Sequence, residues 1–137
     1  MEFRPEKADH VVNFIEKLKH FQQPFAGKPF ILEQWQKWFL YGIYGWYYTD
    51  TDDRVIKHII LDCGRKTGKS MLAAAMSLYA MLEGGYGIEC DIVANTRAQA
   101  KILFDMCVGI SKRMDPKRKH LRQTINRIKY DKKESFI

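Results

Sequence analysis

One stretch in the middle of the chain constrains the fold most, because it joins a strand-like run, a basic loop and a helix-like run. Residues 55–61 are β-branched and mostly apolar, which predicts a buried strand. Residues 63–70 contain two glycines and three basic side chains, and residues 71–82 are mostly alanine, leucine and methionine, which are strong helix formers. A strand that enters a glycine-containing loop and continues as a helix is the local context of a phosphate-binding loop.

The loop matches the Walker A pattern, G-x-x-x-x-G-K-[ST], at Gly68, Lys69 and Ser70. Cys63 stands where the pattern has its first glycine, and Gly64 follows it. Successive backbone N–H groups in such a loop form an anion site together with the N-terminus of the next helix. We therefore expect nucleotide phosphates to bind here; the alternative is a basic turn that only joins a strand to a helix.

Each residue type in the loop has a chemical role if a nucleotide binds. Lys69 is expected to place its charge on the β- and γ-phosphates, and Ser70 to ligate Mg²⁺ through its hydroxyl. Gly68 allows the backbone to approach the phosphates closely. The other expected members of the nucleotide site are Gly64, Arg65, Lys66 and Thr67.

Hydrolysis needs a second carboxylate, at the end of another strand, that holds Mg²⁺ through water. Asp62 enters the phosphate loop itself, and Asp91 lies inside an expected strand, so neither is a convincing candidate. We therefore expect the isolated chain to bind a nucleotide and to hydrolyse it poorly.

The remaining sequence predicts further helices and a second strand. Residues 6–21 carry apolar side chains at helical spacing and predict an amphipathic helix. Residues 32–48 are strongly aromatic, so a helix there should be buried on more than one side or should face a partner. Residues 88–94 predict a strand, and Thr96 is expected to cap the following helix, with Gln99 reaching back in a capping box.

The order strand, helix, strand, helix implies parallel strands joined by crossover helices. The last helix is expected to end at Asp115. Ile125, Ile128 and Tyr130 are expected to lie on a short strand that turns at residues 131–134. We therefore expect an α/β fold, an incomplete P-loop NTPase parallel sheet with flanking helices. Residues 1–53 would form an N-terminal helical segment, and residues 54–137 the front part of the ATPase core.

Length and composition exclude several other classes. With 137 residues and 46% hydrophobic side chains, the chain has the content of one folded domain and is too short to add a second catalytic one. No apolar run is long enough to span a membrane, and the N-terminus lacks the apolar core of a signal peptide. Three widely spaced cysteines argue for a reducing compartment, and no cysteine–histidine spacing fits zinc.

The net charge of +7 is concentrated near the C-terminus. Residues 97–133 hold 12 lysines and arginines and 3 aspartates and glutamates, a net charge of +9. The positive charge is densest at residues 112–113 and 117–119. This asymmetry suggests a polyanion partner bound mainly through its phosphates. A solvated surface, or a face that meets an acidic part of a longer protein, gives the same pattern.

Three segments, in the same order along the chain, resemble the large subunit of tailed-phage terminases. Residues 65–70, Arg-Lys-Thr-Gly-Lys-Ser, resemble the R-K-x-G-K-[ST] form of Walker A in that family, which often lacks the first glycine. Residues 29–36 resemble the family's segment that ends in Trp-Gln, and residues 92–100 resemble its second strand and Gln-Ala-bearing helix. Together these matches cover about residues 28–105.

The resemblance implies the N-terminal part of an ASCE-type P-loop ATPase that uses ATP and Mg²⁺ to drive double-stranded viral DNA into a procapsid. By position, Gln36 would lie near the adenine, Lys69 would be catalytic, Arg65 would sense the γ-phosphate, and Ser70 would ligate Mg²⁺. The implied partners are DNA, a portal protein, the terminase small subunit and further copies in a ring, at the procapsid portal in the bacterial cytoplasm. The Walker B acids, the coupling motif and the nuclease of that family have no counterpart here and would lie beyond residue 137, as in a fragment or a truncated gene.

Two other functions fit parts of the sequence. A fragment of a helicase-like P-loop nucleic-acid ATPase would share both the loop and a glutamine upstream of it. A non-catalytic nucleic-acid- or protein-binding module would use the basic C-terminal segment and the aromatic helix, and the Gly-Lys-Ser triplet would be incidental.

Overall fold

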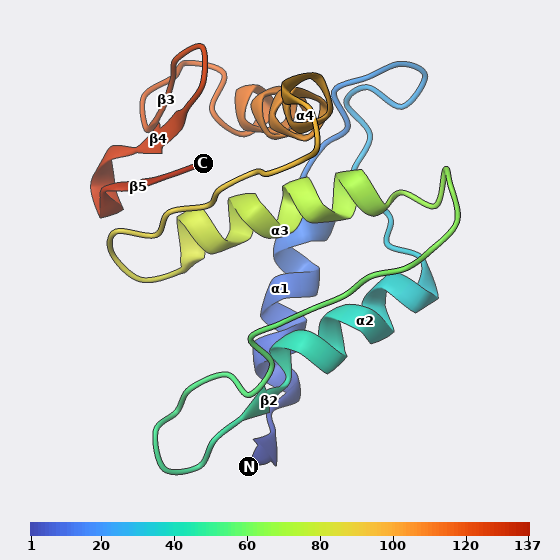
Figure 1. Cartoon of the computed structure of the whole chain (residues 1–137), viewed down its shortest axis with the longest axis vertical. Coiled ribbons are helices and arrows are strands. Elements are labelled where there is room, and N and C mark those ends of the chain that lie inside the picture. The colour runs from blue at the N-terminus through green and yellow to red at the C-terminus, as the bar shows by residue number, and fades with distance from the viewer.

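The computed structural model describes residues 1–137, which form four main helices and two small sheets. Helix α3 crosses the middle of the molecule, with α1 behind it, α2 beside α1, and α4 with the C-terminal strands on the other side (Figure 1). The elements in chain order are β1 (Glu2–Phe3), α1 (Pro5–Lys17), α2 (Gln34–Tyr44), β2 (Trp46–Tyr47), α3 (Lys69–Glu83), α4 (Arg97–Met114), β3 (Leu121–Gln123), β4 (Ile128–Tyr130), the 3-10 turn η1 (Asp131–Lys133) and β5 (Ser135–Phe136).

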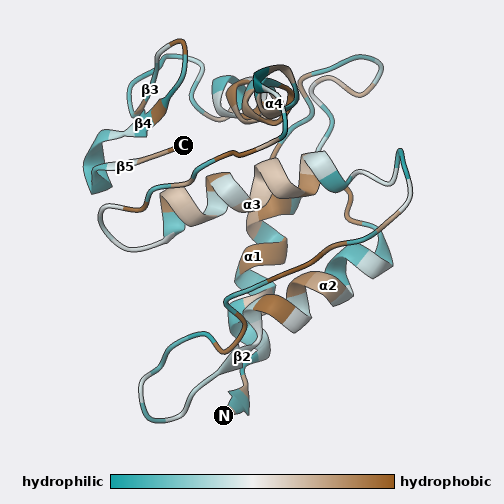
Figure 2. Cartoon of the chain, in the orientation of Figure 1, coloured by the Kyte–Doolittle hydropathy of each residue, from teal (hydrophilic) through white to brown (hydrophobic).

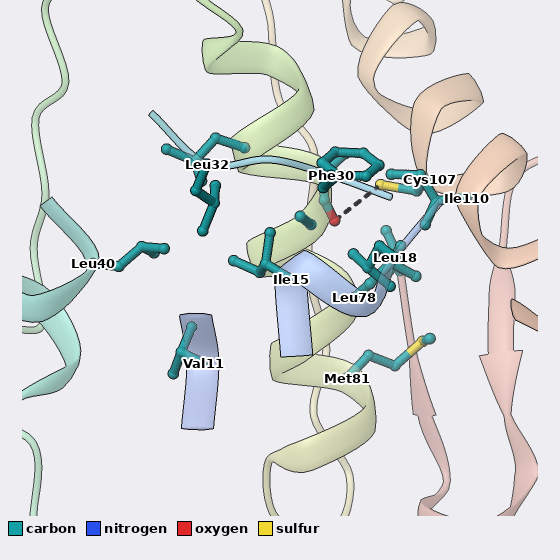
Figure 3. Close-up of a cluster of buried hydrophobic side chains, with 14 of the residues drawn as sticks. Val11, Ile15, Leu18, Phe30, Leu32, Leu40, Leu78, Met81, Cys107 and Ile110 are labelled. Carbon is teal, nitrogen blue, oxygen red and sulfur yellow. Dashed lines mark hydrogen bonds between the residues drawn. The ribbon is translucent and has the colours of Figure 1, made fainter. Parts of the chain in front are cut away.

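The core forms where α3 packs against α1 and α4, and where α2 packs against α1. Leu78 and Met81 of α3 are fully buried, and so are Ile15 of α1, Leu40 of α2 and Ile110 of α4 (Figure 3). The small side chains of the alanine-rich helix α3 let its neighbours approach closely. Because α3 begins at the phosphate loop, this packing holds the loop against the body of the protein.

The predicted N-terminal helix is present but shorter than expected. Helix α1 starts with a proline in its first turn, as predicted, and ends at Lys17 instead of residue 21. The chain reverses there, because the N–H of His20 donates to the carbonyl of Lys28 at 2.9 Å and Lys19 bridges Pro29. Backbone pairing across this loop therefore replaces the last helical turn.

The aromatic segment is a helix over only part of its length, and it buries one face. Helix α2 ends at Tyr44, and the next residues pair antiparallel with β1 as strand β2. Leu40, Ile43 and Tyr44 are buried, whereas the side chain of Trp38 is 68% exposed. Of the two predicted alternatives, burial on more than one side is therefore not met, and a partner on the exposed side of α2 stays a prediction.

The expected parallel strands are extended but lie outside any sheet, and both assigned sheets are antiparallel. Residues 55–61 make a backbone hydrogen bond only at their first residue, where the N–H of Val55 donates to the carbonyl of Trp46. Residues 88–94 have a single parallel bridge, from Glu89 to Phe136. A strand is stable only where a neighbour completes its hydrogen bonds, and no strand pairs with residues 56–61.

Both segments consequently leave apolar side chains in solvent, contrary to the prediction of a buried strand. The side chain of Ile60 is 96% exposed and that of Val93 is 88% exposed. Figure 2 shows hydrophobic colour along both extended segments. The observed architecture is thus a mixed helix and sheet fold, and the parallel sheet is not formed by these residues alone.

The C-terminal part follows the prediction more closely. Helix α4 ends at Met114, with Asp115 as its C-cap, and β4 turns through η1 into β5. Thr96 caps α4 by accepting the N–H of Gln99 at 3.2 Å, but the expected return bond from the Gln99 side chain is not formed. Strand β4 begins at Ile128, so Ile125, which is 88% exposed, lies outside the predicted strand. Strand β3 was not predicted. No helix of the chain has both the length and the apolar character needed to cross a bilayer.

Candidate nucleotide-binding site

The phosphate loop lies between the first extended segment and the N-terminus of α3. Gly68 precedes the first residue of α3 and has a φ of 81°, in the left-handed region that favours glycine. Lys66 also has a positive φ, of 63°. No side chain caps the α3 N-terminus, so the N–H groups of its first turn remain available to an anion.

Hydrogen bonds within the loop hold its two ends together. The hydroxyl of Thr67 donates to the carbonyl of Gly64 at 2.9 Å, and the thiol of Cys63 lies 3.2 Å from the same hydroxyl. The ammonium of Lys69 donates to the carbonyl of Cys63 at 3.0 Å. Cys63, at the missing glycine position, therefore contributes its backbone oxygen and its thiol to loop closure.

The cations and the hydroxyl of the loop have no competing carboxylate. Lys69, Arg65 and Lys66 are exposed and make no ion pair, and the hydroxyl of Ser70 makes no hydrogen bond within the chain. A phosphate oxygen forms a charge-assisted hydrogen bond with an ammonium, which is stronger than the bond that Lys69 makes with a neutral carbonyl. These residues therefore fit a triphosphate, and Ser70 fits a magnesium ligand.

Gln36 is the upstream residue that reaches the loop, although it lies on α2. Its side chain is 7% exposed, and its Oε1 accepts the N–H of Glu33 at 2.9 Å, the return bond of a capping box. Its Nε2 donates to the carbonyl of Thr67 at 3.5 Å. A Cβ atom at Gly68 would lie only 3.2 Å from this Nε2. All eight residues predicted for the site are therefore brought together.

A hollow of about 260 Å³ opens between this loop and the segment that leads into α2. Phe30, Leu32 and Met71 supply apolar walls, and residues 66–68 supply the polar side. His20 also lines the hollow and stacks on Phe30, with ring centroids 4.3 Å apart and an interplanar angle of 3°. Burial lowers the pKa of His20 below its usual 6.5, so the neutral ring is favoured.

Residue patterns alone predict part of this arrangement and miss the rest. The spacing of Glu33 and Gln36 is the available signal for the α2 capping box, which was not predicted. Asp62 and Asp91 are both exposed, and no group of three or more histidine, cysteine or acidic side chains is placed to hold a metal ion. Within this chain, a magnesium ion would therefore depend on Ser70 and on the phosphates themselves.

Comparisons with known proteins identify the family and a related fold. The model of the terminase large subunit ATPase domain family matches residues 34–136. The crystal structure of the HK97 bacteriophage large terminase superposes with a TM-score of 0.74 at 24% sequence identity, over 98% of this chain and 26% of that chain. At that identity the likeness concerns the fold, and the chain spans about a quarter of the length of the HK97 protein. A search of curated proteins found no match. Because the family model covers most of the chain, the protein belongs to the terminase large subunit ATPase domain family.

Proposed function

We propose that this chain is the nucleotide-binding front part of a DNA-packaging ATPase. It would bind ATP and Mg²⁺ at residues 63–70 and would contribute to the translocation of double-stranded viral DNA into a procapsid. The observation that carries the proposal is Lys69 at the start of an uncapped helix, in a chain of this family. Its ammonium makes no ion pair and donates only to the carbonyl of Cys63. Family membership favours this function over a helicase-like ATPase or a non-catalytic binding module.

The loop residues have defined roles in this proposal. Lys69 would exchange the carbonyl of Cys63 for phosphate oxygens, and the backbone around Gly68 would donate N–H groups to them. Arg65 would approach the γ-phosphate from the exposed rim. Ser70 would hold Mg²⁺, which neutralises phosphate charge when bound. The base would occupy the hollow beside Gln36 and Phe30.

Catalysis and assembly would need parts that these residues do not supply. We propose that residues 55–61 and 88–94 become strands of a parallel sheet when further strands of a longer chain lie beside them. The exposed Ile60 and Val93 support this proposal. The portal protein, the small subunit and a ring of copies, at the procapsid in the host cytoplasm, would be the partners of that longer protein. The isolated chain is then expected to hydrolyse ATP poorly.

Calorimetric titration with ATP and Mg²⁺ tests the proposal, on the wild-type chain and on Lys69→Ala. Loss of charge-assisted hydrogen bonds to phosphate should weaken binding at least about tenfold. Lys132→Ala is the matched control, since Lys132 is exposed in η1, near the C-terminal end of α3, and does not line the hollow. Equal affinities of wild type and Lys69→Ala, with both chains folded, would refute the assignment of the loop.

A further inference from the structure

A second charged surface lies at the far end of α4 and takes no part in the nucleotide site. We call it the basic corner; it consists of the last turn of α4 and the following loop, with Lys112, Arg113, Lys117, Arg118 and Lys119. All five side chains are exposed, and none makes an ion pair. Other cations of the same region are neutralised: Lys101 pairs with Asp105 at 2.6 Å, and Arg122 pairs with Asp131 at 2.6 Å.

Hydrogen bonds to Asp115 hold the loop of the basic corner in one conformation. The carboxylate of Asp115 accepts the N–H of His120 at 2.6 Å and that of Leu121 at 3.0 Å, and its carbonyl accepts the N–H of Arg118 at 3.0 Å. The N–H groups of His120 and Leu121, which donate to the carboxylate, lower the pKa of Asp115. The only acidic side chain within residues 112–121 is therefore occupied by backbone donors. Lys112 and Arg118 line one small hollow with it, so the helical and loop cations lie side by side.

We propose that the basic corner binds the phosphate backbone of duplex DNA without regard to base sequence. The inference rests on the proposed function, since it names the surface by which this chain would contact its DNA. Two cations on the last turn of α4 and three on the following loop, all without ion pairs, match a polyanion. Residues 112–121 contain no phenylalanine, tyrosine or tryptophan on which unpaired bases could stack, so the surface suits a duplex rather than a single strand.

None of the five cations of the basic corner belongs to the phosphate loop or lines the hollow beside it. The phosphate loop lies at the N-terminus of α3, whereas the basic corner lies at the C-terminus of α4, and α3 and α4 pack against each other (Figure 1). DNA and nucleotide would therefore contact different residues. Each binding event can be measured without the other.

Fluorescence anisotropy of a labelled random-sequence duplex, at several salt concentrations, tests the proposal on the full chain. The variant Lys117→Gln, Arg118→Gln, Lys119→Gln should bind at least about tenfold more weakly near 0.1 M salt, and its log–log salt slope should be smaller by about 2 to 3. The control Lys17→Gln, Lys19→Gln, Lys28→Gln removes the same charge from exposed positions near the end of α1. Equal losses in the two triple variants would overturn the proposal.

A second variant of the basic corner is tested in case the triple variant at residues 117–119 does not fold, as judged by circular dichroism. Lys112→Gln with Arg113→Gln changes only the last turn of α4, and it should reduce the salt slope by about 2.

A competition experiment distinguishes DNA from an acidic protein partner, with polyglutamate of matched charge as the competitor. Displacement of the duplex by polyglutamate as readily as by unlabelled duplex would point to an acidic protein partner and overturn the assignment to DNA.

Nucleotide binding of the same variants separates this inference from the proposed function. The triple variant at residues 117–119 should bind ATP and Mg²⁺ with wild-type affinity, whereas its affinity for the duplex should fall. A wild-type chain that binds duplex through the basic corner but binds no nucleotide would contradict the proposed function and leave the basic corner supported.

Discussion

The side-chain amide of Gln36 contacts the backbone of Thr67, with 3.5 Å between Nε2 and the carbonyl oxygen. The same amide caps the first turn of α2 through the N–H of Glu33. One buried side chain thus joins the start of α2 to the phosphate loop. The position of the loop consequently depends on α2 as well as on α3, the helix that follows it in sequence.

Two substitutions separate the two contacts of Gln36. Gln36→Ala removes both, and it should lower the free energy of unfolding by about 1–2 kcal/mol, because the N–H of Glu33 loses its acceptor. Gln36→Glu keeps an oxygen for that N–H but loses the donor to Thr67 and adds a negative charge beside the phosphates. Urea unfolding should show the greater loss of stability for Gln36→Ala. Calorimetry should show that Gln36→Glu weakens ATP binding as well; unchanged affinity in this variant would argue against a link between α2 and the nucleotide.

Gly68 should tolerate substitution poorly, whereas Gly85 should tolerate it well. A methyl group at Gly68 meets both a left-handed backbone, with φ at 81°, and the nearby Nε2 of Gln36. Gly68→Ala should therefore cost about 1–2 kcal/mol in the free energy of unfolding and should weaken nucleotide binding. A Cβ atom at Gly85 would have no neighbouring atom within 4 Å, and the φ of Gly85 is not positive, so Gly85→Ala should change stability little. We expect a change of less than about 0.5 kcal/mol. If urea unfolding shows the same loss of unfolding free energy for Gly68→Ala and Gly85→Ala, the left-handed conformation of Gly68 is contradicted.

Local sequence patterns predicted the helices and the phosphate loop. They failed where the structure depends on pairing between residues far apart in the sequence. The apolar spacing before Lys17 predicted α1, but the bridge between Lys19 and Pro29 that shortens the helix joins residues outside any local pattern. Residues 55–61 have strand composition, yet a strand also needs a partner, and no strand pairs with residues 56–61. The loop was predictable because its glycine and its lysine act within a few residues of each other.

Lys133 should stabilise the fold from the far end of α3. Its ammonium donates to the carbonyls of Leu82 and Gly84, at 2.8 and 2.9 Å, and so satisfies acceptors at the C-terminal end of the helix. Lys133→Met should lower the free energy of unfolding by about 1–2 kcal/mol. Lys132→Met is the control, because Lys132 is exposed in the same 3-10 turn and makes no such bond. Matching urea midpoints for the two variants would show that this C-cap contributes nothing.

Stability should fall on mild acidification because of His20. Burial against Phe30 lowers the pKa of His20, so below pH 6.5 the unfolded chain binds a proton that the folded chain does not. The free energy of unfolding is therefore unaffected by His20 well above pH 6.5, and it decreases as the pH falls from 6.5 towards the lowered pKa. His20→Phe keeps an aromatic ring on Phe30 and has no proton to gain. Between about pH 7.5 and pH 5.5 the melting temperature of wild type should therefore drop further than that of His20→Phe; parallel curves would exclude His20 as the cause.

A crystal structure of the chain with Mg²⁺ and a non-hydrolysable ATP analogue tests the central claim, nucleotide binding at the phosphate loop, most directly. We predict the triphosphate within the loop of residues 63–70, Lys69 moved from the carbonyl of Cys63 to phosphate oxygens, and Mg²⁺ on the hydroxyl of Ser70. An analogue bound elsewhere on the protein, with Lys69 still on the carbonyl of Cys63, would contradict this claim.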